Sequence, residues 1–312
     1  RDQPRSRGLG DVYKRQILDG MALTTTNTSS CIKITGNVQF ENSLGVAAIT
    51  SGKYSPDGAV SMALEGRFVF LNNGQALRVW RKSNVVIGDN ALFRGNWIGA
   101  IPIETNDDGG AIWSRGGNVI IGNHAEFDGN YVFSDTRPCC GGVFYDDFFG
   151  GAITVGADAV FTGNFVFSTG YAAHGGAMFV RKDGLQYAAE TGAITIGPNP
   201  SFIKNFAYSG TADAYGGVIY SDGDISFSDG GMFTGNYAKT SGGAITMGGK
   251  CDLLALTKDA LFGGNMTGGV FTRHEDGTFC QGASAYEKRG VAVSVPTWDS
   301  TKCIQCNNCA YV

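Results

Sequence analysis

Three cysteines near the C-terminus have the spacing of a metal-cluster site. Cys303, Cys306 and Cys309 are separated from one another by two residues, which is three quarters of the C-x2-C-x2-C-x3-C-P run that holds [4Fe–4S] clusters. Thiolates at this spacing allow one loop to reach three corners of a cubane. The fourth cysteine would fall one position beyond Val312, so we expect a bound cluster only where the tail is completed in a parent protein. The alternative is a Zn²⁺ site with Cys280 as fourth ligand.

The residues that lead into this cysteine run resemble a known enzyme family. Tyr286-Glu-Lys-Arg-Gly290, followed by Pro296-Thr-Trp298, is similar to the EKR linker and the start of the ferredoxin-like domain of pyruvate:ferredoxin oxidoreductase, over 276–312. The resemblance implies that the three cysteines are iron–sulfur ligands and that the tail is of cytoplasmic origin. Cys280 stands where the family has a proline. The thiamine-diphosphate domains of the family have no counterpart in the sequence, so we expect no pyruvate chemistry in this chain.

Pairs of aspartates are candidates for general acid–base chemistry. Polysaccharide lyases and hydrolases need clustered carboxylates, often with Ca²⁺, together with a basic residue. The same pairs suit solvated turns, which is the interpretation that the sequence favours because no basic partner motif accompanies them. The pairs are Asp107/Asp108, Asp146/Asp147 and Asp222/Asp224. We therefore expect no catalytic residue and no cofactor-binding residue here, and we keep a lyase or hydrolase as a second alternative function.

Two histidines and a vicinal cysteine pair are weaker candidates. His124 and His174 lie in turn-like sequence beside Gly and Ala, without a Gly-His-Gly or Arg-x-Lys motif, so we expect structural roles. Cys139-Cys140 can be redox-active as a pair of adjacent thiols. A loop disulfide to another cysteine, or two free thiols, is the interpretation that we favour.

A repeated Phe-x-x-Asn unit organises most of the chain. It occurs seven times, first at Phe70/Asn73, with steps of 23 to 41 residues between successive Phe residues. A repeat of this length indicates a stacked array. The later copies comprise Phe93, Asn96, Phe127, Asn130, Phe161, Asn164, Phe202, Asn205, Phe233, Asn236, Phe262 and Asn265. A Gly-Gly-(Ala/Val) piece recurs alongside them.

Each unit contains three short β-rich pieces and none shows a sustained helical period. We therefore predict an all-β fold, a parallel β-helix of about seven coils in which each strand pairs with its equivalent one coil away. The Phe side chains then form an internal column, and each Asn occupies a corner where its amide bonds backbone or stacked neighbours. The Gly pairs permit tight corners where a Cβ would clash.

The repeat also resembles a family of surface proteins. Gly-Gly-Ala-(Ile/Val/Leu) combined with Phe-x-x-Asn over roughly 60–270 is similar to the repeat of the chlamydial polymorphic membrane proteins. That resemblance implies a right-handed β-helix displayed outside the cell, with surface glycans or proteins as partners. Our main functional expectation is an extracellular or cell-surface structural or adhesin module. The alternative is a fragment of pyruvate:ferredoxin (flavodoxin) oxidoreductase, so whether the chain is part of an enzyme stays open.

The net charge and the hydropathy of the sequence argue against two kinds of partner, nucleic acid and the membrane interior. The formal net charge is −4, and no basic face of the kind that binds nucleic acid is apparent, so we expect no nucleic-acid partner. No run of 18 apolar residues occurs, so we expect no membrane span in the sequence.

Three segments follow from these patterns. Residues 1–16 share nothing with the repeat and resemble translated sequencing adapter, 17–270 form the repeat domain, and 271–312 form a truncated EKR and ferredoxin-like segment. Exported surface proteins and iron–sulfur clusters belong to different compartments. We therefore expect a chimera of two transcripts joined near 266–276, with a genuine fusion as the alternative.

Overall fold

Short runs that alternate apolar and small or polar residues give the chain its strands. In Asn84–Ile87 and in Asn118–Ile121 the second and fourth residues are buried and the first and third are exposed, as expected for strands with one face on a core. The computed structural model describes residues 16–25, 30–44, 47–52, 59–99, 108–147, 151–181, 193–228, 231–247, 253–254, 261–263 and 271–273. All regular secondary structure in these ranges is β-strand, so the expectation of an all-β fold is confirmed.

The strands form five parallel sheets, named A to E here. Sheet A contains β1 (Gln16–Asp19), β4 (Val38–Glu41), β7 (Phe68–Leu71), β10 (Leu92–Arg94), β14 (Glu126–Asp128), β19 (Val160–Thr162), β24 (Ser201–Ile203), β29 (Met232–Thr234) and β33 (Leu261–Gly263). Sheet B contains β2 (Leu23–Thr25), β5 (Ile49–Ser51), β8 (Leu77–Trp80), β12 (Ile112–Arg115), β17 (Phe144–Asp146), β22 (Met178–Val180), β27 (Ile219–Ser221), β31 (Ile245–Met247) and β34 (Phe271–Arg273).

Sheets C, D and E complete the arrangement. Sheet C contains β3 (Ser30–Thr35), β6 (Val60–Glu65), β9 (Asn84–Ile87), β13 (Asn118–Ile121), β18 (Ala152–Val155), β23 (Ala193–Ile196), β28 (Asp224–Phe227) and β32 (Leu253–Leu254). Sheet D contains β11 (Trp97–Ile98), β15 (Tyr131–Ser134), β20 (Phe165–Ser168), β25 (Phe206–Ser209) and β30 (Tyr237–Ala238), and sheet E contains β16 (Cys139–Cys140), β21 (Ala173–His174) and β26 (Ala214–Tyr215).

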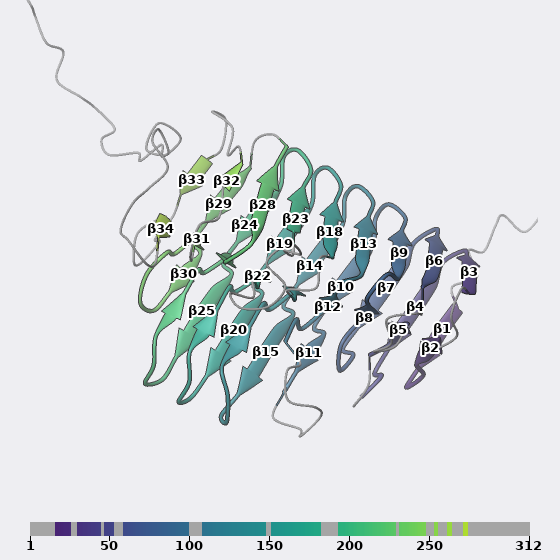
Figure 1. Ribbon diagram of the computed structural model, residues 1–312, viewed down its shortest axis with the longest axis horizontal. Coiled ribbons are helices and arrows are strands. Elements are labelled where there is room, and N and C mark those ends of the chain that lie inside the picture. The colour runs from purple at the N-terminus through teal and green to yellow at the C-terminus, as the bar shows by residue number, and fades with distance from the viewer. Residues whose placement is uncertain are drawn as a thin grey trace, which may run out of the picture.

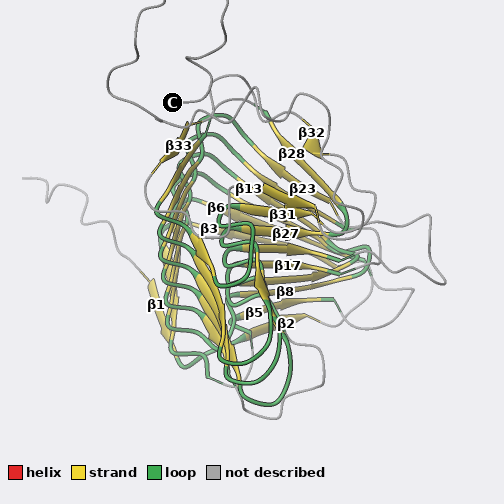
Figure 2. Cartoon of the chain, turned by 90° about the vertical axis from the view of Figure 1, so that its left-hand side faces the viewer, coloured by secondary structure: helices red, strands yellow, loops and turns green. Residues whose placement is uncertain are grey.

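The chain visits the sheets in a fixed order. One circuit passes through sheets A, B and C. In five of the described circuits a strand of sheet D lies between A and B, and in three of these a strand of sheet E follows it, as in β14, β15, β16, β17 and β18. Each strand pairs in parallel with its equivalent in the next circuit. The colours in Figure 1 therefore follow the long axis of the molecule in chain order. Figure 2 shows the strands of each sheet in a row, with loops joining one sheet to the next.

A column of phenylalanine rings fills the space between the sheets. Rings of successive circuits lie 4.5 to 5.5 Å apart with interplanar angles of 9° to 22°. The column consists of Phe40, Phe70, Phe93, Phe127, Phe161, Phe202 and Phe233, each at most 1% exposed. Burial of one such side chain stabilises the fold by about 1.5–3 kcal/mol. Phe262 pairs with Phe233 in the strand register, while Asn265 lies outside the described residues.

A column of asparagines runs beside the phenylalanines. From Asn73 to Asn205, Nδ2 of each asparagine donates to Oδ1 of the asparagine in the next circuit at 2.9 to 3.1 Å. Nδ2 also donates to the Phe carbonyl of the preceding circuit at 2.9 to 3.2 Å. The column consists of Asn73, Asn96, Asn130, Asn164, Asn205 and Asn236, all fully buried. Buried amides are therefore hydrogen-bonded along the whole column, as buried polar groups must be.

Glycine is required at the corner before sheet B. Gly141 has a φ of 62°, in the left-handed region that favours glycine. A Cβ at this position would clash with the carbonyl oxygen of Phe144. Gly175 and Gly216 occupy the same place in the next two circuits, with φ of 67° and 65°. The repeated Gly pair therefore marks a sharp turn of the backbone rather than a ligand loop.

Sheets D and E were missed in the sequence, which predicted three strands in each unit. In sheet D, Tyr131 is half-buried on the outside and Val132 is buried inside, and Phe165 stacks on Tyr131 at 4.8 Å in the next circuit. The strands of sheets D and E have only two to four residues. Each strand of sheet D begins directly after the Asn of a Phe-x-x-Asn unit, so the sequence did not separate it from the strand of sheet A that precedes it.

Candidate functional site

The predicted cluster ligands lie outside the described residues. This applies to Cys303, Cys306 and Cys309, and also to Cys280 and to Asp107. Within the described ranges, no group of three His, Cys, Asp or Glu side chains is arranged to hold a metal ion. The same ranges contain no helix that is long and apolar enough to cross a membrane.

The predicted acidic pairs do not come together. Asp108 accepts a hydrogen bond at Oδ1 from Arg137 at 3.2 Å and another from the amide of Cys140 at 3.0 Å, so it holds a corner of sheet E in place. Asp224 is exposed on β28. Asp147 lies 3.4 Å from Nε of Arg115 in an ion pair with little solvent exposure. Asp108 and Asp147 therefore each have a local partner, and no group of three acidic, histidine or cysteine side chains that could hold a metal ion forms among the described residues.

Asp146 differs from the others because it is fully buried inside a corner between sheets B and C. It occupies the same register position as Ser114 in the preceding circuit. Its Oδ2 accepts a hydrogen bond from the amide of Ala193 at 3.0 Å, and Oδ1 has no hydrogen-bond partner among the described residues. Burial raises the pKa of this carboxyl to about 8. Asp146 is therefore mostly protonated at pH 7, and its side chain is fully buried.

Replacement of Asp146 by Asn should remove a pH dependence of folding. The carboxyl keeps its proton in the folded chain up to about pH 8 and loses it near 3.8 when unfolded. Between these values the folded state binds one more proton, so the free energy of unfolding falls as pH rises, by up to about 1.4 kcal/mol per pH unit. Urea titrations between pH 4.5 and 7.5 measure this slope. Asp146→Asn should flatten it, and the control Asp224→Asn, at an exposed carboxyl, should retain it.

The vicinal cysteines point to opposite sides of β16. Cys139 packs with the small side chains inside sheets D and E, whereas Cys140 packs outside against Trp113, Tyr145 and Phe179. Both thiols are free. Burial raises the pKa of Cys139 to about 12 and that of Cys140 well above its ordinary value, so neither forms a reactive thiolate at neutral pH. Of the two sequence interpretations, free thiols match this structure.

The histidines are also separate from one another. His174 lies on sheet E with its ring 4.6 Å from Tyr220 and 5.5 Å from Tyr215, so it packs among aromatic rings. His124 is exposed at a turn, and its Nδ1 lies 3.5 Å from Asp158. His174 pairs with Cys140 in the strand register, but burial raises the pKa of that thiol, so this pair provides no reactive thiolate at neutral pH.

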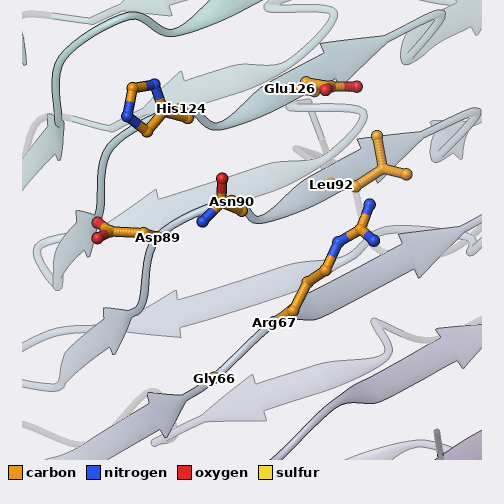
Figure 3. Close-up of a pocket in the computed structure, with 7 residues that line it drawn as sticks. All are labelled: Gly66, Arg67, Asp89, Asn90, Leu92, His124 and Glu126. Carbon is orange, nitrogen blue, oxygen red and sulfur yellow. The ribbon is translucent and has the colours of Figure 1, made fainter. Parts of the chain in front are cut away.

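A solvent-open trough lies on the outer face of sheet A. One hollow of about 500 Å³ is lined by Gly66, Arg67, Asp89, Asn90, Leu92, His124 and Glu126. A second hollow of about 570 Å³ is lined by Asn37, Val38, Arg67, Val69, Leu71, Leu92 and Arg94. The two hollows share Arg67 and Leu92, so we treat them as one trough. Figure 3 shows the Arg67 side chain extending toward Leu92, with Glu126 beyond it.

Strand register explains why these residues meet. Leu92 pairs with Val69 of the preceding circuit and with Glu126 of the following one, and all three side chains project outward because the neighbouring Phe residues project inward. Arg67 immediately precedes β7 at the edge of the same surface. Residues that are 23 and 34 positions apart in the chain therefore form adjacent parts of one surface.

The charged groups of the trough differ in their pairing. Arg94 is bound to Asp128 at 2.8 Å, and Oδ1 of Asp89 accepts a hydrogen bond from the amide of Asn123 at 2.7 Å. Arg67 and Glu126 are exposed and have no side-chain hydrogen bond or ion pair among the described residues. The trough thus offers one unpaired cation beside an apolar floor. Arg67 lies in no sequence motif, so it was not among the predicted site residues.

Comparisons with known proteins find relatives for a short part of this chain. It is 48% identical over 66 residues to a pyruvate-flavodoxin oxidoreductase of Enterobacter agglomerans, covering 19% of this chain and 6% of that protein. It is 46% identical over 54 residues to a pyruvate:ferredoxin oxidoreductase of Moorella thermoacetica, covering 17% of this chain and 4% of that protein. It is 56% identical over 36 residues to a pyruvate dehydrogenase [NADP(+)] of Cryptosporidium parvum, covering 12% and 2%.

The extent of these matches is small. The chain spans between 2% and 6% of the length of these three relatives. No protein-family model matches the chain, and no solved structure matches it. The similarity is therefore to a segment of pyruvate oxidoreductases.

The expected adhesin function is wrong. The relatives named above are pyruvate oxidoreductases and a pyruvate dehydrogenase, and no family model supports the resemblance to polymorphic membrane proteins. The associated expectations of a secreted, cell-surface or outer-membrane protein lose their basis with it. The error has a physical origin. The Phe-x-x-Asn and Gly-Gly repeats form the buried columns and the corners of the stacked sheets. Because these residues do not form the outer surface, they do not indicate which molecule the protein binds.

Proposed function

We propose that residues 271–312 are a segment of a pyruvate:ferredoxin or pyruvate-flavodoxin oxidoreductase. The observation that carries the proposal is the 46–48% identity to two such enzymes. The EKR-like run at Tyr286–Gly290 and the cysteines that follow it are the residues that carry the resemblance. The matched stretches cover 19% and 17% of the chain, which is more than the 42 residues from 271 to 312, so in our assignment they also include residues before 271. In the parent protein this segment would begin an electron-transfer domain that serves pyruvate oxidation.

The cysteines of the segment are suited to an iron–sulfur cluster. Three thiolates at x2 spacing are three of the four ligands that a [4Fe–4S] cluster requires. In the parent protein Cys303, Cys306 and Cys309 would hold three corners of the cluster, and the cluster would supply one-electron transfer. The fourth ligand is then a cysteine in the residues that follow.

Sequencing across residue 312 in source nucleic acid tests this proposal. We expect the reading frame to continue with a cysteine directly after Val312 and to reach a second cysteine run, as in two-cluster ferredoxins. A continuation without cysteine contradicts the assignment. Amplification across 266–276 in the same sample decides whether the two parts belong to one transcript, because one continuous product excludes a chimera.

Iron–sulfur reconstitution gives a direct chemical prediction. The full chain ending at Val312 should hold no stoichiometric cluster, because it provides three of the four ligands that the cluster requires. The last cysteine of such a run binds the other cluster in two-cluster ferredoxins, so extension of the full chain by the native residues through the second cysteine run should allow the cluster to form. After anaerobic reconstitution, iron and sulfide analysis together with visible absorption measures the cluster content of the original chain and of the extended chain. Cys306→Ser in the extended chain is the control and should lose the cluster, and an equal yield in this variant would exclude the assigned ligands.

We further propose that residues 17–270 form a right-handed parallel β-helix. Support comes from the regular order of sheets in each circuit and from parallel, in-register pairing between circuits. Right-handed crossovers are the rule for parallel strands. An experimental structure that showed left-handed circuits would overturn the assignment. A glycan or protein partner for this part remains a prediction from the sequence.

A further inference from the structure

We propose that the trough on sheet A binds amphipathic monoanions, a carboxylate or sulfate head with an aliphatic tail of several carbons. The head would be held by Arg67 and the tail would lie over Val69, Leu71 and Leu92. This site is independent of the oxidoreductase segment, because all of its residues belong to the stacked sheets.

Arg67 supplies the recognition of the head. Its side chain is exposed and extends toward Leu92 (Figure 3), it lines both hollows, and it has no ion-pair partner among the described residues. A guanidinium presents paired N–H donors that match the two oxygens of a carboxylate. The other arginine of the trough, Arg94, is already engaged by Asp128. Arg67 is therefore the cation that a ligand can take as its partner.

The floor beside Arg67 supplies the recognition of the tail. Leu71 and Leu92 are half-buried along its length, and Val69, which pairs with Leu92, is 5% exposed. Val38 also borders the hollow, but it pairs with Phe68 and belongs to the inner core. The hollow has a volume of about 570 Å³, within the usual range for small-molecule sites. An aliphatic tail would remove Leu71 and Leu92 from water, at about 0.8 kcal/mol for each CH₂ that becomes fully buried.

The opposite end of the trough restricts the charge of the ligand. Asp89 and Glu126 line the other hollow, and Glu126 is one circuit beyond Leu92 in the strand register. These carboxylates repel a second negative charge near Arg67. They therefore disfavour phosphate esters and other polyanions, and they direct the tail of a monoanion away from Glu126, toward Leu71.

The proposal is tested by titration of the full chain with octanoate below its micelle concentration, followed in ¹H–¹⁵N spectra. We expect saturable shifts of amides in β7 and β10, weaker binding of butanoate, and similar binding of octyl sulfate. Arg67→Gln should weaken octanoate binding about tenfold, as expected for loss of a charged hydrogen-bonded partner. The matched control Lys204→Gln removes one exposed positive charge after β24 and should leave binding unchanged.

A second pair of variants tests the tail. Leu92→Asn should weaken octanoate binding and reduce its advantage over butanoate, whereas Leu44→Asn, at a leucine that is 66% exposed away from the trough, should do neither. The proposal would be overturned if octylammonium bound as tightly as octanoate, or if Arg67→Gln and Lys204→Gln had equal effects on octanoate binding. Amide shifts confined to sheets other than sheet A would also overturn it. Absence of any shift at saturating octanoate would overturn it as well.

Discussion

Phe161→Ala should destabilise the chain by about 3–5 kcal/mol, the range for removal of a large aromatic side chain from a packed core. Phe161 is fully buried, and its ring lies 4.5 Å from Phe127 and 4.8 Å from Phe202. It also meets Phe144 edge-on at 5.8 Å. Alanine would leave a cavity in the middle of the column that neighbouring rings, held by their own strands, cannot fill. Urea denaturation followed by far-UV circular dichroism measures the loss.

Phe165→Ala is the matched control for this prediction. Phe165 is four residues further along and stacks between Tyr131 and Phe206 at 4.8 and 4.7 Å, but it is half-buried on the outside of sheet D. Because much of its surface already contacts water, we expect a loss of about 1–2 kcal/mol. Equal losses for the two variants would show that the inner column is not the main source of stability.

Asn164→Ala should cost on the order of 4 kcal/mol, although only a small side chain is lost. Nδ2 of Asn164 donates to the carbonyl of Phe127 and to Oδ1 of Asn205, both at 2.9 Å. Its Oδ1 accepts from the amide and from Nδ2 of Asn130 at 2.9 and 3.0 Å. Alanine removes all four bonds and leaves buried partners without water, at about 1–3 kcal/mol for each unsatisfied group.

Two comparisons separate this effect from a general loss of asparagine. Asn118 donates to Asn84 at 2.8 Å on the exposed face of sheet C, so Asn118→Ala should change stability by no more than about 0.5 kcal/mol. Asn164→Asp keeps the shape of the side chain but places a carboxylate against the Oδ1 of Asn205 and a carbonyl, so it should be at least as harmful as alanine. A harmless Asn164→Asp, measured by urea denaturation at pH 7, would contradict the role of the amide.

The parts of the fold that were predictable are those in which the same residue type recurs at the same place. The spacing of Phe161 and Asn164 from their equivalents predicted stacked units with parallel strands, and the structure has parallel strands throughout its described sheets. Phe40 was missed as a member of the column because Ser43 stands where its asparagine would be. Ser43 nevertheless donates its backbone N–H to Oδ1 of Asn73 at 3.1 Å, so the column continues through the main chain.

The trough was predictable only in part. The Phe steps of 23 and 34 residues give the pairing of Val69, Leu92 and Glu126, since each of these residues precedes a Phe of the repeat. They do not show that Arg67, in the turn before β7, lies on the same surface. Buried Asp146 was likewise read as part of a turn, since nothing in Asp146-Asp147 shows that the first side chain faces inward and the second pairs with Arg115.

The in-register pairing of equivalent strands bears on how a gene of this kind can change in length. Each circuit presents to the next the same Phe ring, the same Asn amide and the same glycine corner that the previous circuit presents to it. Unequal crossing-over that adds or removes one whole circuit would therefore join surfaces that already match. A partial unit would misalign every column at the junction. Drift in size should then proceed in whole turns of the chain, while single-residue insertions accumulate in the connecting loops.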